Sequence, residues 1–356
     1  MPTEVSSHTA RRIIQSLVQS GQPPKCGASL FNVGTEQDLD RLERDYLEDY
    51  LAAFEGQDGG GVCRWVEADY GNGKTQFLRC MQERSWKMNY VTAFVELSQD
   101  ECPLDRPERV YGAVARAIQA SPSNPADLDR SKGIDVMLQQ LLDRMFPGVL
   151  SGFPTDELKA QALEWVTHSL SHTPVEDTAF VRAATQHLIA HLTGDEENAR
   201  LSAMFLRGES LPVAETKKLG VYEKLKKDNG FRLMRSMCQV IQRSGLASGT
   251  VLLFDEARRS LSLLSTKSQK IACENLLSVI NGCNDGKLPG TMFIYAVMPE
   301  FFTNFAVAYP ALLQRCGPNT RIRLNEISGI KETDLLILIG ERTEVVKPNE
   351  TVPFAN

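Results

Sequence analysis

Arg64-Trp-Val-Glu-Ala-Asp-Tyr-Gly-Asn-Gly-Lys-Thr-Gln-Phe-Leu78 is the stretch that decides the fold of this 356-residue chain. An apolar-leaning run ends at Ala68, a glycine-rich turn follows, and the residues after Thr75 have the spacing of an amphipathic helix. Strand, turn and helix in this order are the context of a phosphate-binding loop. Ala68 stands where the consensus has its first glycine, and alanine is the mildest replacement. The alternative to a phosphate-binding loop is a chance turn before a helix.

The residue types of this loop suit a polyphosphate. Gly71 and Gly73 allow the backbone to curl so that N–H groups point inward at an anion, and the helix that begins near Lys74 adds its positive end. We expect Lys74 to reach the β- and γ-phosphates of ATP and to act in catalysis, and the hydroxyl of Thr75 to ligate Mg²⁺. The nucleotide-binding residues predicted here are Asp69, Tyr70, Gly71, Asn72, Gly73, Lys74, Thr75 and Gln76.

A second apolar run, Gly249-Thr-Val-Leu-Leu-Phe-Asp-Glu256, ends in two carboxylates. Its lack of alternation predicts a parallel strand buried on both faces, whose carboxyl end lies at the ligand-binding edge of an α/β sheet. We expect Asp255 to hold Mg²⁺, directly or through water, and Glu256 to polarise the attacking water as general base. By itself the pair would be the surface end of a strand, but downstream of a phosphate loop the catalytic interpretation is favoured.

Further strands are predicted at residues 89–97, 291–297 and 321–324. Met298 follows the strand at 291–297, where ATPases of this layout carry a polar sensor of the γ-phosphate; its thioether cannot do this, which leaves Tyr295 or Glu300. Between the two halves of the sheet, residues 128–243 show only helical patterns.

These patterns predict an α/β protein with a parallel central sheet and divide the chain into five parts. The parts are an N-terminal helical segment (1–60), the phosphate-loop half of the core (61–125), a helical insertion (126–247), the second half of the core (248–326) and a short lid or tail (327–356).

Composition sets limits on function. A net charge of −6 excludes a generic polyanion binder, so a nucleic-acid surface would be a local patch. No apolar run reaches the length of a membrane-spanning helix, and the first residues lack the features of a signal peptide. The eight cysteines are scattered and form no Cys-x-x-Cys pair, so we expect reduced thiols and a cytoplasmic protein without membrane contact.

Two other patterns have a functional and a structural interpretation. His168 and His172, like His187 and His191, lie four residues apart and could share a metal ion, although polar helix residues are the favoured interpretation. The basic residues within 217–227, with Arg232 and Arg235, could contact DNA phosphates, although a solvated helix face is favoured.

The order and spacing of several motifs resemble a known family. They include Asp69-Tyr-Gly-Asn-Gly-Lys-Thr-Gln-Phe-Leu78, Leu252-Leu-Phe-Asp-Glu-Ala257 and Met298-Pro-Glu-Phe-Phe302, with further pieces at 11–14, 21–24, 31–36, 206–209, 219–221 and 309–315. The chain resembles the ATP-binding proteins of BREX-type bacterial phage-defence systems, a P-loop, AAA+-like family.

This resemblance implies an AAA+-like ATPase that works as a homo-oligomer with other defence-system proteins, on or near DNA. It places Asn32, Val33 and Gly34 near the adenine, which makes 1–60 the adenine-side segment. It also makes Arg315 a candidate arginine finger for a neighbouring subunit; a surface arginine is the alternative. The chain ends soon after its last strand, so the lid of such proteins is expected to be truncated. We therefore expect ATP hydrolysis, with a nucleotide-dependent scaffold or switch as the alternative. A small-molecule kinase is disfavoured because no acceptor site is evident.

Overall fold

The computed structural model describes residues 11, 13, 15, 18–19, 22–54, 60–124, 127–221, 225–226, 229–256 and 265–324. Six strands form one sheet in the order β3-β2-β4-β5-β1-β6. Their bounds are β1 (Gly61–Glu67), β2 (Tyr90–Glu96), β3 (Ile118–Gln119), β4 (Gly249–Asp255), β5 (Thr291–Val297) and β6 (Arg321–Arg323). Every pairing is parallel except that of β2 with β3. The predicted α/β class is confirmed, and the sheet, which was predicted to be parallel, is mostly parallel.

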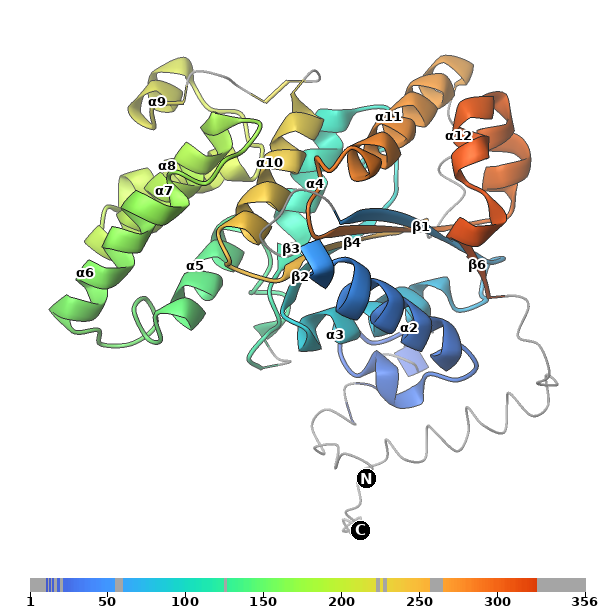
Figure 1. Cartoon of the computed structure of the whole chain (residues 1–356), viewed down its shortest axis with the longest axis horizontal. Coiled ribbons are helices and arrows are strands. Elements are labelled where there is room, and N and C mark those ends of the chain that lie inside the picture. The colour runs from blue at the N-terminus through green and yellow to red at the C-terminus, as the bar shows by residue number, and fades with distance from the viewer. Residues whose placement is uncertain are drawn as a thin grey trace, which may run out of the picture.

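Helices cover both faces of this sheet (Figure 1). One face carries α2 (Glu36–Leu42), the π-helical η2 (Glu43–Tyr50) and α3 (Lys74–Lys87), and the other carries α4 (Pro107–Ala117), α10 (Gly230–Arg243) and α11 (Thr266–Asn284). Within β4, Val251 and Leu253 face the α3 side while Leu252 and Phe254 face the α10 side. All residues of β4 and β5 are buried, because the helices leave neither face of these strands to solvent.

The short strand β3 was not predicted. Helix α4 ends at Ala117, and the backbone is extended at Ile118. Ile118 then pairs with Ala93 and Gln119 with Thr92. A two-residue strand is too short to show alternation in a sequence.

The described residues between β3 and α10 form helices and no strand, as expected. They form α5 (Ile134–Met145), α6 (Asp156–Glu164), the π-helical η5 (Trp165–Leu170), α7 (Thr178–Thr193), α8 (Glu196–Leu206) and α9 (Val213–Lys218). Buried side chains of these helices, such as Leu138, Phe180 and Leu206, belong to the same hydrophobic cluster as Val95 and Phe254 of the sheet. The insertion therefore packs on the core through a continuous apolar interior.

His187 and His191 of α7 both approach the side-chain amide of Gln139, each with Nε2 at 3.0 Å from Gln139 Nε2. The other ring nitrogen of His187 lies 3.2 Å from the carbonyl oxygen of Ala199. If the amide donates to both rings, His187 is neutral and donates from Nδ1. No group of three or more His, Cys, Asp or Glu side chains in the described part of the chain is arranged to hold a metal ion, and no described helix is long and apolar enough to cross a bilayer.

Burial of His187, reinforced by the nearby His191 and opposed by Asp135, lowers its pKa to about 4. The unfolded chain binds a proton on this ring below its ordinary pKa of 6.5, and the folded protein does not. Folding stability is therefore complete above pH 6.5 and is lost as the pH falls towards 4.

We predict that the free energy of unfolding falls by about 2 kcal/mol between pH 7 and pH 5 through His187 alone. The measurement is urea denaturation at several pH values. His187→Gln should flatten this slope, whereas His168→Gln, at an exposed position of η5, should keep it. An unchanged slope in His187→Gln would show that another group carries the acid sensitivity.

Candidate nucleotide-binding site

The loop between β1 and α3 has the backbone of an anion cradle. Gly71 and Gly73 have φ of 84° and 82°. A Cβ added at either position would meet nothing within 4 Å, so glycine is needed for its left-handed backbone conformation and not because of crowding. Residues 69–73 are exposed. Gly73 caps α3 without a side-chain hydrogen bond, so the first N–H groups of the helix remain open to an anion.

Lys74 is buried at the start of α3, with 8% of its surface exposed. Its ammonium donates to the carbonyl oxygens of Ala68 at 2.7 Å and Asp69 at 2.8 Å. Burial lowers the pKa of Lys74, and the negative charges of Asp255 and Glu256 oppose this shift. The cation thus lies at the base of the loop and faces the acidic end of β4.

Thr75 and Asp255 meet across the site, although 180 positions separate them in the sequence. The Thr75 hydroxyl donates to Asp255 Oδ2 at 2.7 Å. Burial raises the pKa of Asp255, and the hydrogen bond from Thr75 and the charge of Lys74 oppose this shift. Asp255 Oδ1 is buried and has no hydrogen-bond partner among the described residues. A hydroxyl beside an unused carboxylate oxygen is a donor set that suits Mg²⁺.

Glu256 follows β4 directly and is 5% exposed. Its N–H donates to the carbonyl oxygen of Ala296, and the N–H of Met298 donates to its Oε2 at 3.5 Å. The segment at the end of β5 therefore orients Glu256 through the backbone. Met298 makes this contact with its main-chain N–H, so the type of its side chain could not predict it.

The two alternative sensor residues lie in different surroundings. Tyr295 is within β5 and stacks on Trp65 and Phe254, with ring centroids 5.0 and 4.7 Å away, inside the apolar layer under α11. Glu300 lies close enough for its charge to raise the pKa of Lys74. Of the two, only Glu300 is near the phosphate loop.

Asn32, Val33 and Gly34 follow the short 3₁₀ helix η1 (Ala28–Phe31), which packs against α3. Asn32 is 6% exposed, and its Oδ1 accepts a hydrogen bond from the Thr35 hydroxyl at 2.8 Å. Gln76, predicted to bind nucleotide, donates its side-chain amide to the carbonyl oxygen of Ala28 at 2.7 Å. Gln76 therefore joins the phosphate-loop helix to the segment predicted to lie near the adenine.

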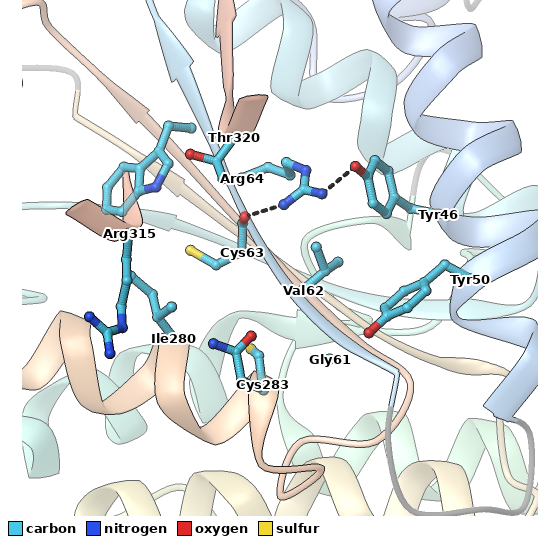
Figure 2. A pocket seen from close by; sticks show the side chains of 12 residues that line it. Tyr46, Tyr50, Gly61, Val62, Cys63, Arg64, Ile280, Cys283, Arg315 and Thr320 are labelled. Carbon is cyan, nitrogen blue, oxygen red and sulfur yellow. Dashed lines mark hydrogen bonds between the residues drawn. The ribbon is translucent and has the colours of Figure 1, made fainter. Parts of the chain in front are cut away.

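Arg315 ends α12 (Pro310–Arg315) and lies far from the phosphate loop of its own chain. It lines a cavity of about 370 Å³ together with Gly61 and Cys63, at the amino end of β1 (Figure 2). The loop follows the other end of this seven-residue strand, roughly 20 Å away at 3.3 Å per residue. Arg315 is exposed, and its Nε donates to Asn281 Oδ1 at 3.2 Å.

The described basic residues near the end of the insertion are largely paired within the protein. Lys218 forms an ion pair with Glu197 at 2.8 Å, and Arg235 forms one with Glu176 at 2.5 Å. Arg232 likewise pairs with Asp177. These pairs favour a structural role of Lys218, Arg232 and Arg235 over contact with DNA.

One comparison with known proteins, that with protein families, agrees with the motifs. No curated protein and no solved structure matches the chain. The model of one family, described as "BREX system ATP-binding protein BrxC/D", matches residues 5–331 of the 356. This range includes the phosphate loop, the Asp255-Glu256 pair and Arg315, and it confirms the resemblance seen in the sequence. The chain therefore belongs to the BrxC/D family of BREX system ATP-binding proteins.

Proposed function

We propose that this protein is an AAA+-like ATPase of a bacterial phage-defence system, which couples its nucleotide state to the assembly or remodelling of a DNA-associated complex. Its partners in this proposal are further copies of itself and other defence-system proteins. The observation that carries the proposal is the hydrogen bond between Thr75 and Asp255. It brings a phosphate-loop hydroxyl and a strand-end carboxylate together, with Glu256 next in the chain.

Each residue of the site has a distinct role in this proposal. The first N–H groups of α3 and the ammonium of Lys74 bind the phosphates, and phosphate oxygens replace the carbonyl partners of Lys74. Thr75 and Asp255 would hold Mg²⁺, which when bound neutralises charge on the β- and γ-phosphates. Glu256 accepts a proton from the attacking water.

The strand order supports the AAA+-like assignment. Strand β5 lies between β1 and β4, so the residues that follow it stand between the phosphate loop and the acidic pair. From this position they can contact the γ-phosphate and respond to its presence beside both the phosphate loop and the acidic pair.

The chemistry at the end of β5 also favours the second candidate, a scaffold or switch that hydrolyses ATP slowly or not at all. Met298 has no polar side chain, and its N–H already points at Glu256. The predicted lid at 327–356 lies outside the described residues. An ATPase assay at increasing protein concentration, with and without duplex DNA, separates the candidates. Measurable ATP affinity without turnover at any concentration supports the switch.

We predict that Glu256→Gln keeps ATP binding but lowers kcat by roughly 10²–10⁴, because the amide cannot accept the proton. Calorimetry with ATP and phosphate release from the same preparation give the two values. The matched control is Lys74→Ala, which should lose ATP binding because it removes the cation at the base of the loop. Turnover at the parental rate in Glu256→Gln would show that Glu256 is not the general base.

We further predict that Arg315 acts on the site of a neighbouring subunit. Arg315→Ala should lower kcat by about 10³ or more. Mixing it with the inactive Lys74→Ala should restore turnover, because some interfaces then combine an intact loop with an intact arginine. The control mixture of Lys74→Ala with Glu256→Gln should stay inactive, since neither chain has both Lys74 and Glu256. Failure of the first mixture to recover would argue for a surface role of Arg315.

A further inference from the structure

The carboxylate of Glu83, in the third turn of α3, accepts three backbone hydrogen bonds from a segment more than 50 positions earlier in the chain. Its Oε1 accepts from the N–H groups of Gly27 and Ala28, the latter at 2.9 Å, and its Oε2 accepts from the N–H of Ser29 at 3.1 Å. These are N–H groups at the start of η1, which has no side-chain cap of its own. Glu83 therefore supplies the cap from another element.

A second contact with η1 comes from the end of α3 that adjoins the phosphate loop. Gln76 precedes Glu83 by seven residues, so the two side chains lie two turns apart on one face of α3. The amide of Gln76 donates to the carbonyl oxygen of Ala28, whose N–H donates to Glu83. Ala28 is thus bound through both of its backbone polar groups to a helix that begins in the phosphate loop.

A carboxylate is a specific choice at this position. Its two oxygens accept all three N–H groups, and hydrogen bonds to a charged acceptor are stronger than neutral ones. The neighbouring Arg84 pairs instead with Asp40 and Glu43. Within the described residues, the hydrogen bonds of Glu83 all come from the segment at 27–29.

The segment that η1 positions is the one predicted to lie near the adenine. Only two residues separate Ser29 from Asn32. The Asn32 side chain is buried and fixed by Thr35, and Gly34 turns the chain with a φ of 83°. With η1 bound to Gln76, the residue that follows Thr75, this segment lies beside the phosphate loop.

We propose that Glu83 is a positioning residue that fixes residues 32–34 relative to the phosphate loop, so that recognition of the nucleoside part of ATP depends on this carboxylate. Binding of the triphosphate part does not depend on it. This inference rests on the proposed function, which places ATP in the loop, and on the position of the adenine beside residues 32–34 that the family resemblance implies. Glu83 takes no part in the chemistry itself.

The test compares two ligands, ATP and inorganic tripolyphosphate, each with Mg²⁺, by calorimetry on the full chain. Glu83→Ala should raise the Kd for ATP on the order of tenfold, as expected for the loss of one or two charge-assisted hydrogen bonds. The Kd for tripolyphosphate should stay unchanged. Glu83→Gln, which keeps the shape and one acceptor oxygen, should fall between parent and Glu83→Ala for ATP.

Arg84→Ala is the matched control, because it removes the ion pairs of the adjacent residue and leaves η1 attached. It should leave both Kd values as in the parent. Equal weakening of both ligands in Glu83→Ala and Glu83→Gln, or no weakening of either, would overturn the inference. A parent that binds tripolyphosphate as tightly as ATP would overturn it too while leaving the phosphate loop intact. A parent that binds neither ligand would instead refute the proposed function, and the inference with it.

Discussion

The parallel alignment of β1, β5 and β4 is the constraint on which the site depends. It brings the carboxyl ends of three strands to one edge, although they come from distant parts of the chain. The ladder continues past the strands, since Ala68 donates to the carbonyl oxygen of Val297 and Glu256 donates to that of Ala296. The first residue of the phosphate loop and the proposed general base are therefore placed by main-chain hydrogen bonds to β5 and its end.

The site buries charges of both signs. Lys74, Asp255 and Glu256 are all at least nine-tenths buried, and the charges of Lys74 and Arg79 both act on Asp255. Burying charges opposes folding unless partners compensate, and the raised pKa of Asp255 records this penalty. In the proposed function, a cation bound beside Asp255 Oδ1 would lower this penalty further. Metal binding and the burial of the acidic pair would then have the same electrostatic origin.

The sequence predicted the parts of this protein that depend on side-chain type. Apolar runs without alternation predicted β4 and β5, and the loop spacing predicted the cluster of Lys74, Thr75 and Asp255. The parts it missed depend on the main chain. Met298 acts through its N–H, and Glu83 binds N–H groups that every residue except proline carries. Main-chain partners leave no pattern of residue types in a sequence. For Glu83, the available signal was its position seven residues after Gln76, on the same face of the helix.

The long interval between paired strands has a consequence for synthesis on the ribosome. β2 pairs with β4, which follows more than 150 residues later. At a synthesis rate of roughly 5–20 residues per second, about 8–30 s pass between the synthesis of β2 and that of its partner strand. Helices of the insertion form in this interval from local contacts. The nascent chain must therefore keep a sheet edge open beside a growing helical layer, and the phosphate loop acquires its acidic partner only when the last third of the chain emerges.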